Sequence, residues 1–442
     1  MTVLGRLRYH GSVDVLGRAA LRFERKRLER KLRAACAAWS HPHLSPPLSS
    51  SPWLKELIYT HYLKGRFANA RGKVAWVTSG APVELLVALG YYVLYPENHG
   101  AVCAIRRTAE ELCAVAESGG YSRDLCSYAR TDLGSLLSGK TPVGRLPRPD
   151  LRLCCTNICQ TVLYWYQVLA HHFHVPLILI DTPFLYGGTS DHAVAYVKRQ
   201  LELAVEPAER VAGQRLSMKV LHDVTVQSQE AVGLWLRVLE TAKHRPSPIT
   251  AFDEFIHMAP IVEMRGERFT VDYYRALLSE LEGRVAAGQG ALRAEKRRLV
   301  WDNLPIWSRI RWLAERLAAR GVALVASTYT QAWGELAALI DPDQAFESAA
   351  RVYLHVILNQ GTGHKLRVMQ KMVQEYGADG VILHSDRSCK PYSIGQLDQK
   401  ERIQRECGVP SLLLEADHND PRAFSEEQVE NRLGAFMEVL GV

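Results

Sequence analysis

The chain has 442 residues, of which 47% are hydrophobic and 23% charged, so it can bury large cores and is not a mainly disordered protein. Lysine and arginine number 54 against 47 acidic residues, a net charge of +7. The first forty residues contain ten basic and three acidic residues, which accounts for the whole excess. These basic residues belong to one short helical region without interleaved aromatics, a pattern that disfavours nucleic-acid binding. A docking surface for partner subunits or for phosphate groups explains the basic end better.

The composition also constrains the setting of the protein. No apolar run approaches the ~18 residues of a membrane span, and the start lacks the pattern of an export signal, so we expect a cytoplasmic protein. Nine cysteines in a cytoplasmic chain of this length do not indicate a disulfide framework. Metal binding or catalysis is the better explanation for any cysteine that is functional.

The predicted elements begin with a helical section. Helices are expected over residues 19–39 and 53–69, separated by a proline-rich and serine-rich connector over 41–52. From residue 73 strands and helices alternate. Strands are expected at 74–78, 91–95, 151–156 and 175–181, and helices at 82–89, 106–118 and 160–172.

A helical middle section covers residues 191–287, and the alternation then returns. Strands are expected at 298–301, 322–326, 380–384 and 411–415, with helices at 307–320, 394–406 and 425–440 and a helical section before residue 376. This order is typical of parallel sheets covered by helices. The sequence therefore predicts an α/β protein: a helical N-terminal section (1–70), a first α/β domain with a helical insertion (71–287), and a second α/β domain (288–442).

Three cysteines occupy positions that suit a site. Cys126, Cys159 and Cys389 fall in loops or at helix starts, where ligands of open α/β sheets gather and where backbone amides favour thiolates. Two would come from the first domain and one from the second, so they could meet across a cleft. The alternative is that each packs as a small hydrophobic residue. Cys154 and Cys155 are adjacent in a predicted strand and should point to opposite faces.

Several motifs resemble the 2-hydroxyacyl-CoA dehydratase / benzoyl-CoA reductase family in the family's order, from about residue 70 onwards. They are Tyr95-Pro-Glu-Asn-His99, Tyr121-Ser-Arg-Asp-Leu-Cys-Ser-Tyr-Ala-Arg-Thr-Asp-Leu-Gly134, Thr156-Asn-Ile-Cys-Gln160, His384-Ser-Asp-Arg-Ser-Cys-Lys-Pro-Tyr392 and Gly408-Val-Pro-Ser-Leu-Leu-Leu-Glu-Ala-Asp-His418. Within the family the resemblance is greatest to B subunits of ATP-dependent class I benzoyl-CoA reductases.

The resemblance implies one [4Fe–4S] cluster held by Cys126, Cys159 and Cys389, with one iron left for another ligand. Cys155, four residues before Cys159, is the alternative middle ligand. The family also places a serine and a carboxylate near the cluster, which fall on Ser79 and Glu97. A helix cap is the alternative for Ser79, and a solvated loop acid for Glu97. His99 is a further candidate proton donor, with a structural hydrogen bond as the alternative.

The resemblance further implies a ferredoxin-dependent oxidoreductase that reduces benzoyl-CoA to cyclohexa-1,5-diene-1-carbonyl-CoA in anaerobic aromatic degradation. It also implies that ATP acts on a two-subunit activator supplied with electrons by reduced ferredoxin. A smaller homologous cluster subunit would complete the complex. The alternatives are a subunit of a 2-hydroxyacyl-CoA dehydratase and a non-catalytic, cluster-holding electron-transfer protein.

Overall fold

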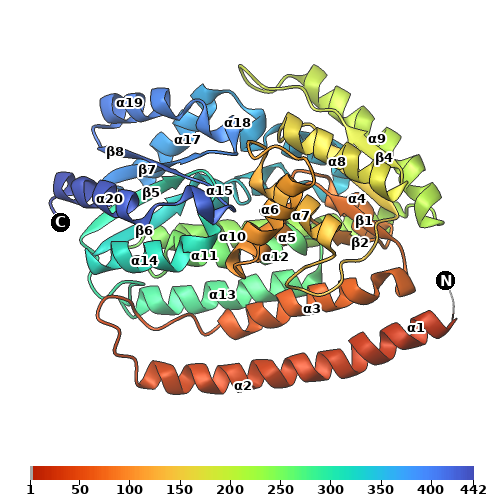
Figure 1. The fold of residues 1–442 in the computed structure, drawn as a ribbon, viewed down its shortest axis with the longest axis horizontal. Coiled ribbons are helices and arrows are strands. Elements are labelled where there is room, and N and C mark those ends of the chain that lie inside the picture. The colour runs from red at the N-terminus through yellow and green to blue at the C-terminus, as the bar shows by residue number, and fades with distance from the viewer. Residues whose placement is uncertain (1–2) are drawn as a thin grey trace.

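The computed structural model describes residues 3–442. It contains two four-stranded parallel sheets that lie side by side and are surrounded by helices (Figure 1). The first sheet has the order β2-β1-β3-β4 and consists of β1 (Val74–Val77), β2 (Tyr92–Leu94), β3 (Leu151–Cys155) and β4 (Leu177–Ile180). The second has the order β6-β5-β7-β8 and consists of β5 (Arg297–Asp302), β6 (Val322–Ser327), β7 (Gly380–Asp386) and β8 (Ser411–Ala416). The predicted α/β fold with a helical N-terminal section is confirmed.

The strands are short and apolar because helices cover both faces of each sheet. Every residue of β1, β3 and β6 is buried. Pairing in register sets Trp76 beside Arg152 in the first sheet and Trp301 beside Ile382 in the second. All eight predicted strands are present, with ends that differ from the expected ones by up to two residues.

The helices fall into four groups along the chain. The N-terminal group is α1 (Val3–Tyr9), a π-helical segment (His10–Gly17), α2 (Arg18–Ala37) and α3 (Ser51–Arg71). The first sheet is accompanied by α4 (Val83–Ala88), α5 (Pro96–Ile105), α6 (Ala109–Ser118), α7 (Ser127–Ser138), α8 (Gln160–Phe173) and α9 (Asp191–Ala212). The middle group is α10 (Met218–Glu240), α11 (Ala251–His257), α12 (Ala259–Glu263) and α13 (Arg268–Ala286). The last group is α14 (Ile310–Ala319), α15 (Thr328–Gln331), α16 (Ala345–Leu354), α17 (Thr362–Glu375), α18 (Lys390–Ser393), α19 (Gln396–Cys407) and α20 (Glu426–Leu440).

Two helix starts lie at candidate site residues. Glu97 was expected in a loop but lies in the first turn of α5, which begins at Pro96 and ends before the helix predicted from residue 106. Proline at the first helical position followed by an acid is a helix-start signal, so a helix here is physically reasonable. Helix α7 begins at Ser127, directly after Cys126.

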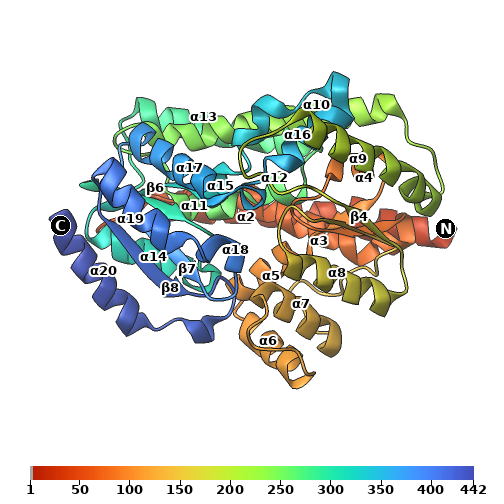
Figure 2. The same ribbon diagram turned by 90° about the horizontal axis from the view of Figure 1, so that it is seen from above.

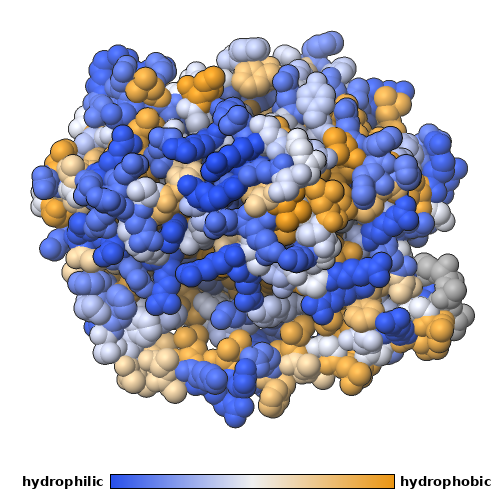
Figure 3. Space-filling view, viewed as in Figure 1, coloured by the Kyte–Doolittle hydropathy of each residue, from blue (hydrophilic) through white to orange (hydrophobic). Residues whose placement is uncertain are grey.

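The basic N-terminal segment forms one long helical rod that lies along α3 and crosses both halves of the molecule (Figures 1 and 2). Helix α2 has no buried residue, although Arg25 pairs with Glu56 of α3 at 2.8 Å. Phe23 is 65% exposed, and hydrophobic side chains appear among hydrophilic ones along the edge where this rod lies (Figure 3). The predicted role of this rod as a docking surface stays a prediction, as do the domain boundaries at 70/71 and 287/288.

No helix within residues 3–442 is both long and apolar enough to cross a membrane. The packing instead directs apolar side chains inward. One continuous apolar cluster joins the middle helices, the second sheet and one face of the first sheet, while a separate cluster fills the other face of the first sheet beneath α4 and α9.

Candidate active site

The strand order creates a switch point in each sheet. In the first sheet β1 has β2 on one side and β3 on the other, and β5 lies between β6 and β7 in the same way in the second. Chain connections leave such points in opposite directions, which opens a crevice at the carboxyl ends of the strands. Ser79 follows β1 and Cys159 follows β3, while Leu304 follows β5 and Cys389 follows β7.

All four of these residues line one cavity between the two sheets, with an empty volume of about 1070 Å³ that includes its open mouth. The other lining residues come from both halves of the chain and are mostly apolar or aromatic. They are Gly80, Glu97, Cys126, Tyr128, Ile158, Val162, Trp165, Arg265, Tyr329, Ala332, Trp333, Leu336, Val352, Tyr353, Val356, Ile357, Leu358, Pro391, Tyr392 and His418. We call this space the cysteine cavity.

The three predicted cysteines meet in the cysteine cavity, and each one caps the amino end of a helix. Cys126 precedes α7, Cys159 precedes α8, and Cys389 precedes α18. The amide of Val162 donates to the Cys159 Sγ at 3.4 Å. Unpaired amides at helix starts carry partial positive charge, so this arrangement stabilises negatively charged sulfur.

The thiols of Cys159 and Cys389 do not ionise readily without a cation. Burial and the neighbouring Cys126 raise the pKa of Cys159 to about 12, and burial raises the pKa of Cys389 well above its ordinary value. A bound cation replaces the thiol protons and compensates the charge, so three converging thiols in an apolar cavity suit a metal–sulfur group. The donor set therefore fits an iron–sulfur cluster with three cysteine ligands.

Neither cysteine of the doublet beside Cys159 lines this cavity. All nine cysteines are free thiols, and Cys154 and Cys155 are both fully buried. Cys154 belongs to the apolar cluster on one face of the first sheet and Cys155 to the cluster on the other, which confirms their predicted alternation. Neither lines the cysteine cavity, whereas Cys159 does.

Ser79 and Glu97 lie together at the wall of the cysteine cavity. The Ser79 amide donates to the Glu97 Oε1 at 3.1 Å. The Tyr166 hydroxyl oxygen lies 3.0 Å from the Glu97 Oε2 and 2.6 Å from the Val77 carbonyl oxygen. Burial raises the pKa of Glu97 to about 7. One phenol hydrogen cannot serve both acceptors, so a protonated Glu97 that donates to Tyr166 satisfies every group.

His99 is not among the residues that line the cysteine cavity. Helix α5 buries it fully, and its Nε2 lies 2.8 Å from the Thr141 Oγ1 and 3.5 Å from the Cys103 Sγ. Burial lowers the pKa of His99 to about 4, so the ring is neutral near pH 7. These contacts are those expected if His99 makes a structural hydrogen bond, the alternative given for it in the sequence analysis.

A polar network missed by the sequence prediction fastens α7 to the second sheet. His418, from the loop after β8, has Nδ1 2.7 Å from the Asp386 Oδ2 and Nε2 3.0 Å from the Ser127 Oγ. The Ser127 amide donates to the Ser388 Oγ at 3.1 Å. The His418 Nε2 also lies 4.0 Å from the Cys126 Sγ. Asp386, Ser388 and His418 lie inside motifs quoted above, but no spacing rule showed that they would meet.

Electrostatics hold this network together. Burial alone would lower the pKa of His418, but Asp386 and Asp417 raise it well above its ordinary value. Candidate ligand atoms of these three residues lie within 4.8 Å of one another. They already bond to each other and to backbone amides, since the Asp417 Oδ1 accepts from Asn419 and Asp420. Asp386, Asp417 and His418 therefore form a buried ionic cluster whose polar atoms bond within the protein.

Close packing against α6 fixes the position of α7. A side chain at Gly134 would put a Cβ 1.8 Å from the Leu112 carbonyl oxygen of α6, so only glycine permits this approach. The buried Arg130 donates to Asp420 at 2.8 Å, and this bond ties the same helix to the loop after β8. Cys126 thus sits at the end of a helix that is fixed to both halves of the molecule.

The site defines a class of protein: a two-sheet α/β subunit with three cysteines, a serine and a buried glutamate around one apolar cavity. The family model described as 2-hydroxyglutaryl-CoA dehydratase, D-component, matches residues 78–440. The chain belongs to this family.

Several characterised relatives resemble almost the whole chain. The (R)-2-hydroxyisocaproyl-CoA dehydratase alpha subunit of Clostridioides difficile is 34% identical over 391 residues, covering 88% of this chain and 95% of the relative. The (R)-phenyllactyl-CoA dehydratase alpha subunit of Clostridium sporogenes is 33% identical with the same coverage. The B subunit of benzoyl-CoA reductase from Thauera aromatica is 30% identical over 402 residues, covering 87% and 93%. Dehydratase and reductase subunits are both represented.

The ion pair of the network gives a stability prediction. Asp386→Asn removes the nearer of the two carboxylates that pair with His418 and leaves the buried cation only Asp417 at 3.8 Å, so we expect the free energy of unfolding to fall by about 3 kcal/mol. The measurement is anaerobic chemical denaturation. The control is Glu415→Gln, which breaks the exposed pair with Arg387 at 2.6 Å and should cost no more than about 1 kcal/mol. Equal losses in the two variants would contradict a buried ion pair.

Proposed function

We propose that this chain is the cluster-bearing, acyl-CoA-binding subunit of an enzyme complex that transfers single low-potential electrons to an acyl-CoA thioester. The observation that carries the proposal is the meeting of Cys126, Cys159 and Cys389 in one apolar cavity that Ser79 and Glu97 also line. Membership of the family supports the substrate class. The names of the relatives, as alpha and B subunits, support a multi-subunit assembly with a homologous partner.

Cys126, Cys159 and Cys389 are the residues that would hold a [4Fe–4S] cluster, with one iron left without a cysteine ligand. When bound, the cluster supplies single electrons at low potential. The chain's own residues contribute the surroundings. Apolar and aromatic side chains exclude water, which protects a reactive radical anion of the substrate from quenching.

Glu97 and Ser79 supply polar chemistry at the wall of the cavity. Glu97 with a pKa of about 7 has a substantial fraction of its acid form at neutral pH and can donate its proton to the substrate at low energetic cost. The Tyr166 hydroxyl and the Ser79 amide hold both carboxyl oxygens in place. The half-buried Ser79 offers its hydroxyl to an oxygen of the substrate. His99 lies outside the cavity lining, so we assign the proton donor to Glu97.

Two reactions share this machinery. The first is the two-electron reduction of benzoyl-CoA to cyclohexa-1,5-diene-1-carbonyl-CoA, supported by the motifs and by the relative that is the B subunit of a benzoyl-CoA reductase. The second is dehydration of a 2-hydroxyacyl-CoA, in which the electron is returned after each turnover. Identities of 33% and 34% to dehydratase alpha subunits, against 30% to the reductase relative, favour dehydration. The apolar cavity favours an apolar acyl group in both.

The complex would include partners that this chain cannot replace. The G-x-x-x-x-G-K-T pattern at Gly134–Thr141 begins within helix α7 and not in a loop between a strand and a helix, so it does not form a P-loop. We assign ATP hydrolysis to a separate two-subunit activator, for which reduced ferredoxin is the proposed electron source. The activator would deliver electrons to the cytoplasmic complex of this subunit and its smaller homologue.

Exchange of single cysteines tests the cluster ligands. Cys126→Ala, Cys159→Ala and Cys389→Ala should each lose most of their iron after anaerobic purification, because each removes one of three thiolates. Cys155→Ala is the matched control for the middle position, because Cys155 packs in the core of the first sheet, and it should retain the iron. The measurement is the iron and sulfide content of each purified variant relative to wild type. Iron loss in Cys155→Ala with full retention in Cys159→Ala would refute the assignment.

The number of ATP molecules used per product separates the two reactions. A reductase consumes ATP with every turnover because the electrons remain in the product. A dehydratase needs ATP only for activation and then completes many turnovers. The test incubates the complex with its activator and benzoyl-CoA or a 2-hydroxyacyl-CoA, and counts phosphate against product. Turnover of neither thioester would contradict both reactions.

The protonation of Glu97 predicts a pH dependence. Its acid form predominates below the pKa of about 7, so kcat/KM should fall about tenfold per pH unit above that value. Glu97→Gln should lose this limb and about 10²–10⁴-fold in rate. Glu263→Gln is the control, because burial also raises the pKa of Glu263 to about 7 but Glu263 does not line the cysteine cavity. If the Glu97→Gln enzyme keeps the alkaline limb, another group donates the proton.

A further inference from the structure

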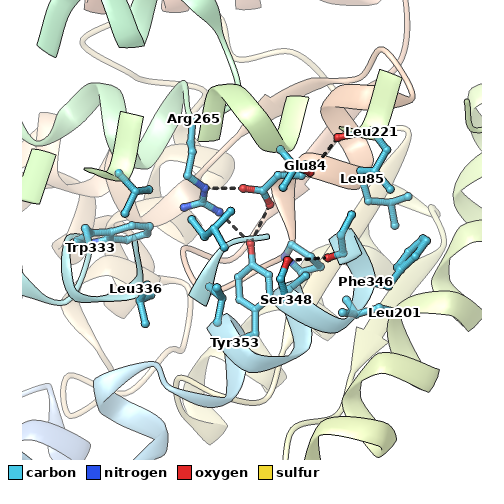
Figure 4. Close-up of a pocket in the computed structure, with 17 residues that line it drawn as sticks. Glu84, Leu85, Leu201, Leu221, Arg265, Trp333, Leu336, Phe346, Ser348 and Tyr353 are labelled. Atoms are coloured by element: carbon cyan, nitrogen blue, oxygen red, sulfur yellow. Dashed lines mark hydrogen bonds and ion pairs between the residues drawn. The ribbon is translucent and has the colours of Figure 1, made fainter. Parts of the chain in front are cut away.

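A second cavity adjoins the cysteine cavity. Its empty volume is about 630 Å³, and it lies among α4, α9, α10 and α16 (Figure 4). Five residues line both cavities, so the two spaces share a wall. These residues are Arg265, Trp333, Leu336, Val352 and Tyr353.

The polar groups of the shared wall are occupied by one another. The Arg265 Nε donates to the Glu84 Oε1 at 2.7 Å, and its Nη2 donates to the Tyr353 hydroxyl at 2.8 Å. The Tyr353 hydroxyl donates to the Glu84 Oε2 at 3.1 Å, which closes the triangle seen in Figure 4. The Arg265 guanidinium also lies over the Trp333 ring at 5.7 Å. The triangle is therefore a rigid, charge-balanced frame.

The remaining polar groups of the second cavity also have partners within the protein. The Ser348 hydroxyl donates to the Asp341 carbonyl at 3.0 Å, and the Thr225 hydroxyl donates to the Leu221 carbonyl at 2.8 Å. The rest of the lining is hydrocarbon, with Leu85, Leu201, Leu221, Val232, Ile340 and Phe346 among it. A polar ligand would lose its hydration here without gaining hydrogen bonds, whereas a hydrocarbon ligand gains by burial.

We propose that the second cavity binds the distal hydrocarbon part of the acyl group whose thioester lies beside the cysteines. This inference rests on the proposed function and specifies its substrate class: an acyl-CoA whose apolar acyl group extends past Trp333 and Leu336. These two side chains line both cavities, so the proposed path of the acyl group runs between them. Two observations support a hydrocarbon ligand. The two cavities share a wall, and the polar side chains described above already bond within the protein.

Affinity as a function of acyl length tests the inference. Straight-chain acyl-CoAs from acetyl to decanoyl are titrated into the anaerobic complex without an electron donor, so that no turnover occurs. Burial of each further methylene should tighten binding about fourfold until the second cavity is full. Ala349→Phe places a ring in the second cavity only and should abolish this increase for the longer chains.

The controls separate blocking from general damage. Ala195→Phe adds the same ring on the exposed face of α9, outside both cavities, and should keep the length dependence. Ala345→Leu, another lining position, replaces Ala349→Phe if that variant does not fold. An identical length dependence in the blocked variant and wild type would overturn the inference, as would equal weakening at every length. Failure of wild type to bind any acyl-CoA would instead overturn the proposed function.

Discussion

The structure depends on fixing the amino end of α7 against the carboxyl ends of β7 and β8. Ser127 bonds to Ser388 and His418, and His418 bonds to Asp386, so Cys126 is held beside a residue from the second sheet. Without this contact the first sheet would offer Cys159 and the second Cys389, but the third sulfur would have no fixed place. Buried charge pairs are costly to break, which suits a contact that must keep two halves in register.

This constraint links folding to chemistry. Burial raises the pKa values of Cys159 and Cys389, so these two thiols remain neutral alone. A metal–sulfur group would join both halves of the chain at one centre, and the same helix ends would stabilise its negatively charged sulfurs. The surrounding cavity is apolar, and its one acid with a pKa near neutrality, Glu97, faces the same space. The proposed function thus combines electron delivery, exclusion of water and proton supply in one cavity.

Sequence patterns predicted the architecture well because short apolar strands and amphipathic helices are local features. The same logic singled out the three cysteines, since loops and helix starts can be recognised without knowing their neighbours in space. Long-range contacts were not predictable. Arg265 and Glu84 are separated by 181 positions, and His418 and Ser127 by 291, so no periodicity connects them. Helix α5 was missed although Pro96 indicated it, and with it the orientation of His99 towards Thr141.

The most direct test of this account is the position of iron in the folded protein. Crystals of the anaerobically purified complex, measured at the iron absorption edge, give an anomalous difference map. The account predicts one compact iron peak in the cysteine cavity, in contact with the sulfurs of Cys126, Cys159 and Cys389. Iron bound elsewhere, at Asp386, Asp417 and His418 for example, or a fully reconstituted complex without iron in this cavity, would contradict it.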